Sequence, residues 1–229
     1  MAGTKIRSLW DQAAGTYESD VFHLTKYPRA IEKVMAHIRR GKVLDLGCGP
    51  LGHMLGALAA HGCDPMGLDI SPTMVRETKK HFKGRVVCDD ARGTALESNF
   101  FDSVVSINSI LPEERPDVLK IFAEVHRVLK PGGRLVAFLP SYDYVTKLAE
   151  SGLPVEQDPH QFRVRDTTGW QCFYTEETIR NLMSATGYAK WELAVEVFDG
   201  KEVLADMKRI YGFDFSELPV EEYFLVATK

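Results

Sequence analysis

The sequence predicts an α/β fold with a parallel sheet, because short apolar runs alternate with helix-like patterns through the middle of its 229 residues. The apolar runs that we expect to form strands are Lys42–Leu46, Pro65–Asp69, Arg85–Cys88, Phe101–Ile107 and Gly133–Leu139. Before the last of these, apolar residues recur at helical spacing from Val118 to Leu129, and Pro131 with Gly132 ends the pattern. Strands that alternate with helices in this way are typical of βαβ units.

Two helices and two strands are expected after this core. Thr175, which two glutamates follow, is the predicted N-cap of a helix that ends at Gly187. Strands are expected at Lys190–Phe198 and Glu222–Thr228. Between them, the apolar stripe in Lys201–Tyr211 is typical of a packing helix.

Two amphipathic helices are expected before the core, over residues 7–17 and 27–39. Either they pack on the edge of the sheet or they close over a ligand site, and their periodicity favours neither. Since no stretch rich in Pro, Gly or Ser divides the chain, we expect a single domain.

Composition and charge argue against several classes of protein. A formal net charge of −4 and an isoelectric point near 6.0 indicate no strong basic surface for nucleic acid. The four cysteines lie far apart without a CxxC pair, which argues against a zinc ribbon and a secreted disulfide framework. The N-terminus lacks the apolar core of a signal peptide, and no apolar stretch approaches the roughly 18 residues of a membrane span. We therefore expect a cytoplasmic protein without membrane contact.

A glycine-rich run, VLDLGCGPLG over residues 43–52, stands where the first expected strand ends and a helix begins. Gly47, Gly49 and Gly52 have the GxGxxG spacing of a dinucleotide site, so a nicotinamide or flavin cofactor has to be considered. Asp45 favours a different cofactor, because a carboxylate so close to the glycines would repel a pyrophosphate but attract a cationic amino group. S-adenosylmethionine carries such a group and no phosphate.

Two more acidic residues follow the next expected strands. Asp69 lies 22 residues beyond Gly47, where a carboxylate can accept hydrogen bonds from the ribose hydroxyls of an adenosine. Asp90 follows the third strand, and it either reads the edge of an adenine or stabilises a turn; for its neighbour Asp89 we favour the turn role. These residues predict an adenosine site without identifying the reaction.

In their order, the segments DLGCGPLG, GLDIS, DDA, FFDSVVS and RVLKPGGRLVAF resemble the class I S-adenosylmethionine-dependent methyltransferases, most closely the small-molecule group called methyltransferase type 11. The resemblance covers about residues 43–139. It implies a Rossmann-like sheet of seven strands in the order 3-2-1-4-5-7-6, with strand 7 antiparallel and helices on both faces. It also implies S-adenosylmethionine as cofactor, S-adenosylhomocysteine as product and an N-terminal helical lid.

Residue roles follow from the same resemblance. Asp45, Gly47 and Gly49 would contact the methionine part of the cofactor. The other implied contacts are Asp69 and Ile70 at the ribose, Asp90 and Ala91 at the adenine, Ser106 and Ile107 at the far wall, and Met74 packed either on the adenine or in the core. Tyr17 is the predicted lid residue, in a segment similar to the group's WDxxAxxY helix. The chain departs from the group at Leu51, where a third glycine is usual, and it lacks the histidine often found after the fourth strand.

The stretch from residue 140 to 172 is too long for an ordinary connection of roughly 2–6 residues, so we expect it to cap an acceptor pocket. Tyr142, Trp170 and Arg163 are the predicted wall residues, since small-molecule pockets combine aromatic surfaces with a few polar groups. A satellite hydrophobic cluster with surface charges is the alternative. His160 and His23 are the candidate general bases, because histidine titrates near neutral pH. No spacing of ligands predicts a metal.

The sequence thus predicts an enzyme that transfers a methyl group from S-adenosylmethionine to O, N or C of a small-molecule acceptor by in-line displacement. The alternatives are a methyltransferase that acts on RNA or protein and a cofactor-binding regulator without turnover. We expect a monomer or homodimer of one domain. Its expected parts are the helical lid (1–40), the cofactor-binding core (41–139), the substrate cap (140–174) and the C-terminal part of the sheet (175–229).

Overall fold

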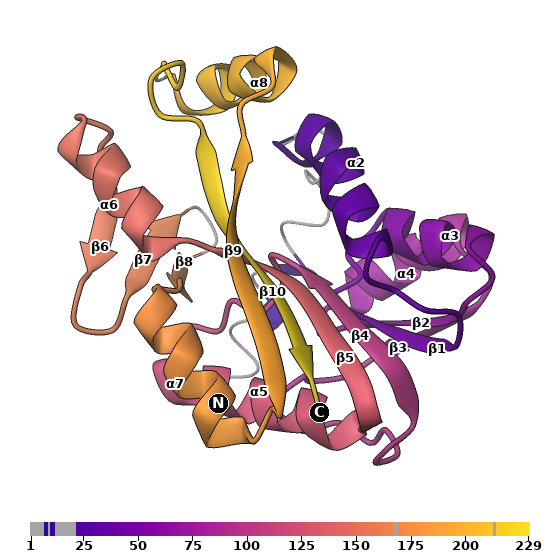
Figure 1. Cartoon of the computed structure of the whole chain (residues 1–229). Coiled ribbons are helices and arrows are strands. Elements are labelled where there is room, and N and C mark those ends of the chain that lie inside the picture. The colour runs from indigo at the N-terminus through magenta and orange to yellow at the C-terminus, as the bar shows by residue number, and fades with distance from the viewer. Residues whose placement is uncertain (1–6, 9, 12–21, 167–168, 213) are drawn as a thin grey trace.

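The computed structural model describes residues 7–8, 10–11, 22–166, 169–212 and 214–229. Its main feature is a seven-stranded sheet in the order β3-β2-β1-β4-β5-β10-β9 (Figure 1). The strands are β1 (Lys42–Leu46), β2 (Asp64–Asp69), β3 (Arg85–Cys88), β4 (Phe101–Ile107), β5 (Leu129–Pro140), β9 (Lys190–Phe198) and β10 (Val220–Thr228). β10 runs antiparallel to β5 and β9, and the pairs among β1 to β5 are parallel. The predicted strand order with an antiparallel seventh strand is confirmed.

Helices cover both faces of the sheet (Figure 1). They are α2 (Phe22–Met35), α3 (His53–Ala60), α4 (Pro72–His81), α5 (Arg115–Val128), α6 (Tyr142–Glu150), α7 (Glu176–Thr186) and α8 (Lys201–Tyr211). Buried residues of α5 and α7 share one core cluster with the sheet, and those of α2, α3, α6 and α8 share a second cluster. Two separate cores on one sheet are the expected result of strands that are apolar on both faces.

The predicted ends of α7 are confirmed. Thr175 Oγ1 accepts from the N–H of Thr178, and Thr178 Oγ1 accepts from the N–H of Thr175, which completes a capping box. Gly187 ends the helix with φ of 79°, a left-handed conformation that glycine adopts without steric cost.

Several elements extend beyond their predicted bounds, and α2 and β5 do so the most. α2 begins five residues before the expected start at residue 27 and ends four residues before 39. Its buried residues Ala30 and Val34 pack against the sheet, so this part of the helix has a packing role. β5 begins at Leu129 instead of Gly133, because Leu129 still pairs with Phe101 across an irregularity in the β4–β5 register.

The segment after β5 forms a substructure of its own. It holds α6 and a small antiparallel sheet of β6 (Glu156–Asp158), β7 (Arg163–Asp166) and β8 (Gly169–Cys172). Arg115, at the start of α5, fastens this sheet by donating hydrogen bonds to the carbonyls of Gln161, Phe162 and Phe173. A guanidinium that binds three carbonyls from two separate stretches joins the small sheet to α5.

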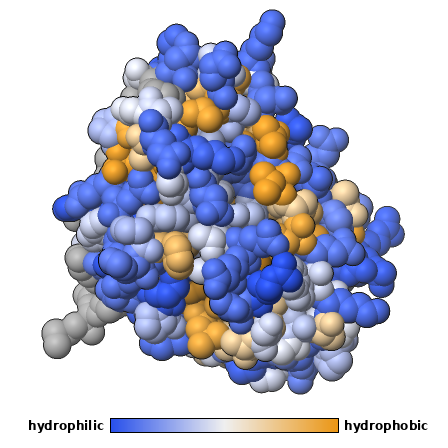
Figure 2. All heavy atoms as spheres, turned by 60° about the vertical axis from the view of Figure 1, so that its left-hand side comes forward, coloured by the Kyte–Doolittle hydropathy of each residue, from blue (hydrophilic) through white to orange (hydrophobic). Residues whose placement is uncertain are grey.

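The surface is mostly hydrophilic, with small separated apolar groups on the face that Figure 2 shows. The exposed large apolar side chains of the described residues are Leu119, Val195 and Val197. Within the described ranges, no helix combines the length and the apolar character that a membrane crossing requires. All four cysteines are free thiols.

Candidate functional site

The glycine loop after β1 is folded tightly over the end of β2. The N–H groups of Gly47 and Cys48 both donate to the carbonyl of Leu68, at 2.7 and 3.0 Å. Gly47 has φ of 73° and Gly49 has φ of 59°, the left-handed region in which glycine is the least strained residue. This turn exposes backbone at the carboxyl end of β1, where β2 and β4 flank it. It is the topological switch point at which such sheets bind ligands.

Asp45 is a buried carboxylate directly before this loop. Only 3% of its surface is exposed, and its Oδ2 atom has no hydrogen-bond partner among the described residues. Burial, and next the negative charge of Asp69, raise the pKa of Asp45 to about 8. A buried carboxylate without a partner is costly, and a cationic group beside it would offset that cost. The site therefore fits a ligand that carries an ammonium group.

Asp69, at the end of β2, holds the second buried carboxylate of the site. Its Oδ1 accepts from the N–H of Ser71 at 2.9 Å and its Oδ2 accepts from the N–H of Gly49 at 3.1 Å. Burial raises the pKa of Asp69, although these hydrogen bonds act in the opposite direction. Each carboxylate oxygen can accept more than one hydrogen bond, so Asp69 has capacity left for ribose hydroxyls. The neighbouring Met74 is 2% exposed in the first turn of α4.

The described part of the N-terminal segment reaches this same corner. Oδ1 of Asp11 accepts from Oγ of Ser71 at 2.5 Å and from the N–H of Thr73 at 3.1 Å. The hydrogen bond from Ser71 is the main cause that lowers the pKa of Asp11. Asp11 was not among the predicted site residues, although it is the aspartate of the segment that is similar to the group's WDxxAxxY helix. Tyr17, the predicted lid residue, lies outside the described residues.

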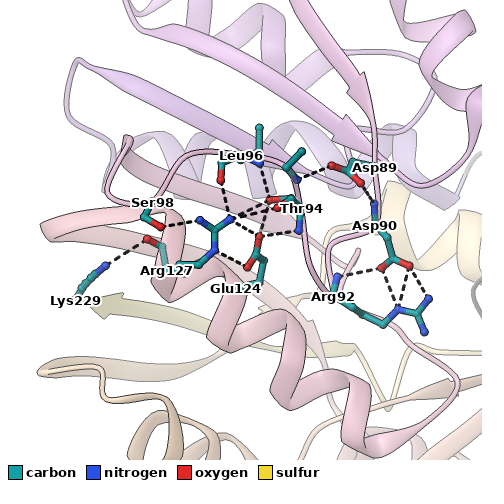
Figure 3. A network of polar contacts seen from close by, with 10 residues as sticks. Asp89, Asp90, Arg92, Thr94, Leu96, Ser98, Glu124, Arg127 and Lys229 are labelled. Atoms are coloured by element: carbon teal, nitrogen blue, oxygen red, sulfur yellow. Dashed lines mark hydrogen bonds and ion pairs between the residues drawn. The ribbon is translucent and has the colours of Figure 1, made fainter.

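The loop after β3 is held by a polar network (Figure 3). Nε and one terminal nitrogen of the Arg92 guanidinium grip the carboxylate of Asp90, with contacts of 2.5 to 3.1 Å. Arg92 also contacts Asp117 of α5 at 2.7 Å. The hydrogen bonds from Arg92 lower the pKa of Asp90. This carboxylate is therefore engaged by Arg92, and the predicted adenine contacts of Asp90 and Ala91 stay predictions.

A second part of the network anchors the same loop to α5. Glu124 accepts from the N–H and Oγ1 of Thr94 at 2.8 and 2.5 Å and pairs with Arg127 at 2.7 Å (Figure 3). Arg127 also donates to the carbonyl of Leu96 at 2.7 Å and to Oγ of Ser98 at 2.7 Å. The hydrogen bonds from Arg127 are the largest cause that lowers the pKa of Glu124 to about 2. The loop that carries Asp90 is thus joined to α5 by several hydrogen bonds and ion pairs.

The loop after β4 contacts the glycine loop from the other side. Ser106 is fully buried, and its Oγ lies 2.7 Å from Oγ of Ser109, which donates to the carbonyl of Leu46. A Cβ atom at Gly47 would lie only 2.2 Å from Cβ of Ser109. Ser106 was predicted at the far wall together with Ile107; Ser109 was missed. Its position is determined by the approach of two loops that are distant in the sequence.

The predicted acceptor residues lie in the segment after β5. Arg163 stacks over the ring of Trp170, with 5.3 Å from its guanidinium carbon to the ring centroid, and pairs with Asp158 at 2.8 Å. Tyr142 is 6% exposed in a small cluster with Val164. The structure therefore brings Arg163 and Trp170 together, while the burial of Tyr142 resembles the satellite cluster that we considered as the alternative.

The two candidate bases are not brought together by the described residues. His160 is exposed in the turn between β6 and β7, where its N–H donates to Asp158 at 3.1 Å. His23 belongs to α2, but its side chain lies outside the described part. Their roles as general bases stay predictions. Among the described residues, no group of three or more His, Cys, Asp or Glu side chains is placed to hold a metal ion.

Residues 44–137 match the family model described as "Methyltransferase domain". Over 211 residues the chain is 25% identical to malonyl-[acyl-carrier protein] O-methyltransferase of Enterobacter lignolyticus, covering 90% of this chain and 78% of that protein. It is 33% identical over 113 residues to 24-methylenesterol C-methyltransferase 2 of Arabidopsis thaliana, covering 46% and 29%. The chain thus spans about 30% of the length of the sterol methyltransferases that it matches.

A solved structure with a similar fold is a SAM-dependent methyltransferase of Thermotoga maritima, described as a possible histamine N-methyltransferase. Its TM-score is 0.68 at 16% sequence identity, and the match covers 97% of this chain and 99% of that one. At this identity the likeness concerns the fold alone.

The sheet order, the glycine loop and the two buried carboxylates define a Rossmann-like cofactor-binding fold of the methyltransferase type. Residues 44–137 match a methyltransferase domain, and the solved structures that share this fold include S-adenosylmethionine-dependent methyltransferases, whose cofactor is S-adenosylmethionine. Asp45 is the feature of the structure that fits this cofactor best, because a buried unpaired acceptor suits its ammonium group.

Proposed function

We propose that this protein transfers the methyl group of S-adenosylmethionine to O, N or C of a small-molecule acceptor by in-line displacement. The observation that supports this most is the buried Asp45, with an unpartnered Oδ2 and a raised pKa, directly before the glycine loop. A pyrophosphate would be repelled at this place, whereas the ammonium group of the amino acid part of the cofactor would be attracted.

The chain's own residues bind the cofactor and orient it toward the acceptor. We propose that Asp45, Gly47 and Gly49 hold the methionine part, that Asp69 and Ile70 hold the ribose, and that Asp90 and Ala91, Met74, Ser106 and Ile107 surround the rest. When bound, the cofactor supplies a sulfonium methyl that is already an activated electrophile. Alignment of both reactants can lower the activation barrier by roughly 7–11 kcal/mol. A general base typically gives a rate gain of roughly 10²–10⁴-fold, which corresponds to only about 3–5 kcal/mol. Positioning is therefore the main task of the protein.

The small-molecule class is supported by the relatives, whose names specify a sterol and a malonyl group on acyl-carrier protein. Action on RNA is disfavoured by the net charge of −4. The remaining alternatives are a methyltransferase that acts on protein and a regulator that binds the cofactor without turnover.

Binding and turnover can be tested separately. We expect calorimetry to show micromolar binding of S-adenosylmethionine and S-adenosylhomocysteine and no binding of NAD. Incubation with a library of metabolites should then release S-adenosylhomocysteine with one or a few of them. Tight NAD binding without heat from either sulfur ligand would contradict the cofactor assignment. Cofactor binding without product release across the library would favour the regulator.

We further propose that residues 140–174 cap the acceptor and that residues 1–40 include a lid, with Tyr17 as the expected lid residue and His23 as an expected general base. The contacts of Asp11 with Ser71 and Thr73 support the second part, because they join the N-terminal segment to the loop after β2. The stacked pair of Arg163 and Trp170 supports the first. Closure of both segments would exclude water from the reacting atoms.

Replacing Trp170 by alanine should raise the acceptor KM about tenfold and leave cofactor affinity unchanged, because a pocket wall of this size contributes about 1–2 kcal/mol. Steady-state kinetics and calorimetry would measure the two effects. Trp191→Ala is the matched control, since Arg180 lies over the ring of Trp191 at the same 5.3 Å, but on β9. Equal acceptor kinetics in the two variants would show that Trp170 is not part of the acceptor pocket.

A further inference from the structure

Asn108 and Glu222 form a partly buried polar pair where the parallel strands end. Nδ2 of Asn108 donates to Oε1 of Glu222 at 2.8 Å. Asn108 follows β4 directly and has φ of 52°, a left-handed conformation that asparagine tolerates better than most residues. Glu222 lies near the start of β10, and only 5% of its surface is exposed. The pair therefore joins the loop after β4 to the last strand of the sheet.

Strand pairing puts Glu222 on the same face of the sheet as Asp45. Val43 and Phe224 belong to one core cluster, and side chains two residues apart on a strand point to the same face. Glu222 lies opposite Pro140, the last residue of β5, so it stands at the carboxyl edge of the parallel strands. The cofactor site lies at this same edge, and Glu222 stands farther along it than Asp45, toward β5 and β10.

The pair presents hydrogen-bond acceptors to this edge. Oδ1 of Asn108 is buried without a hydrogen-bond partner among the described residues, and the oxygens of a carboxylate are hydrogen-bond acceptors. On the adjacent strand, Glu196 lies opposite Glu222 and pairs with Lys33 at 2.9 Å and Arg29 at 3.8 Å. A ligand group that fits an amide oxygen and a buried carboxylate must donate hydrogen bonds. A cationic donor fits best, because attraction between opposite charges strengthens as water is excluded.

We propose that Asn108 and Glu222 recognise an ammonium group of the acceptor, which makes the substrate class of this enzyme cationic amines. Because an ammonium nitrogen has no lone pair, the bound group must release one proton to water before its nitrogen can take the methyl group. The proposal rests on the methyl transfer proposed above and assigns its acceptor. Glu222 supplies the charge that selects the amine, and Asn108 positions that carboxylate while Oδ1 accepts a second hydrogen bond from the same ammonium group.

The first test compares two panels of acceptors by release of S-adenosylhomocysteine. One panel contains primary and secondary amines, and the other contains alcohols and carboxylic acids with the same carbon skeletons. We expect release with members of the amine panel and at least tenfold less with their counterparts. Release confined to alcohols or acids would overturn this inference and keep the proposed function. No release with either panel, despite cofactor binding, would overturn both.

The second test uses the amine that gives the highest rate. Glu222→Gln should raise its KM about 100-fold, because removal of one partner of a buried charge pair has large effects. The Ki of the alcohol with the same skeleton and the Kd of S-adenosylmethionine should stay unchanged. Glu221→Gln is the control, since Glu221 is on the opposite face and pairs with Lys147 at 2.7 Å.

A purely structural pair would give a different result. Glu222→Gln would then change the KM of the amine and the Ki of the alcohol equally, or weaken cofactor binding, and either outcome would overturn the inference. Asn108→Gly keeps the left-handed backbone and removes the amide, so it is a second variant if Glu222→Gln does not fold. We expect it to raise the KM of the amine about tenfold.

Discussion

Replacing Asp45 by asparagine is expected to remove the pH dependence of S-adenosylmethionine binding and to weaken the binding at pH 8. Burial, followed by the charge of Asp69, raises the pKa of Asp45 to about 8 in the cofactor-free protein. Asp45 is therefore mostly protonated at neutral pH, whereas a bound ammonium group favours its ionised form. As the pH falls below 8, the Kd of the native protein for S-adenosylmethionine should rise about tenfold for each pH unit, because Asp45 must lose a proton when the cofactor binds.

Calorimetry between pH 6 and 9, in buffers of different ionisation enthalpy, would measure this proton release. At pH 7 the native protein should release nearly one proton per bound cofactor, and Asp45→Asn should release far less. Asp64→Asn is the control, because Asp64 is exposed at the start of β2. The same proton release from Asp45→Asn and the native protein would show that another group titrates.

The same raised pKa has a consequence for the stability of the cofactor-free protein. Between about pH 4 and pH 8 the native state binds more protons at Asp45 than the unfolded chain does, so the free energy of unfolding falls as pH rises through this window. Asp45→Asn lacks this loss and should resist urea better than the native protein at pH 8. A variant that binds cofactor poorly yet folds more stably is typical of a residue kept for binding.

Most of the sheet could be predicted from local patterns. The bounds of Lys42–Leu46, Arg85–Cys88, Phe101–Ile107 and Lys190–Phe198 agree with the expected strands. Strands β1 and β4 are buried on both faces, so each has apolar residues at neighbouring positions, Val43 with Leu44 in β1 and Val104 with Val105 in β4. The Gly187 helix end was also predictable, because a left-handed C-terminal position selects glycine locally.

The small sheet after β5 could not be predicted in the same way. β6 consists of Glu156, Gln157 and Asp158, which have no apolar alternation and low strand propensity. The sheet is fastened instead by Arg115, whose contacts with the carbonyls of Gln161 and Phe162 come from a distant helix. Strand formation is here a result of tertiary contacts.

The predicted site was incomplete for a related reason. Ser71 and Asp11 lie 60 residues apart, and Asn108 and Glu222 lie 114 residues apart, so no local pattern joins them. The engagement of Asp90 by Arg92 is local, but the spacing of an aspartate and an arginine does not reveal where either side chain points. Motifs identify residues at the ends of strands, whereas the partners of those residues depend on the topology.

Replacing Gly47 by alanine is expected to abolish cofactor binding and to lower the free energy of unfolding by more than the backbone strain alone. Gly47 has φ of 73°, and a Cβ atom there would lie 2.2 Å from Cβ and 2.7 Å from Oγ of Ser109. The loop after β4 would have to move, which would break the hydrogen bond from Ser109 Oγ to the carbonyl of Leu46. Urea denaturation and calorimetry with S-adenosylmethionine would measure the two effects.

Gly132→Ala isolates the cost of the left-handed backbone. Gly132 has φ of 76°, and a Cβ atom there would meet nothing within 4 Å, so this variant should lose only about 1–2 kcal/mol and bind cofactor normally. Ser109→Gly in the Gly47→Ala background removes the atom that causes the clash. If the clash is the cause, the double variant should be more stable than the sum of the two single changes predicts and should recover part of its cofactor affinity. Additive losses would instead attribute the whole effect to the backbone of Gly47, and the contact between the two loops would then have no part in forming the cofactor site.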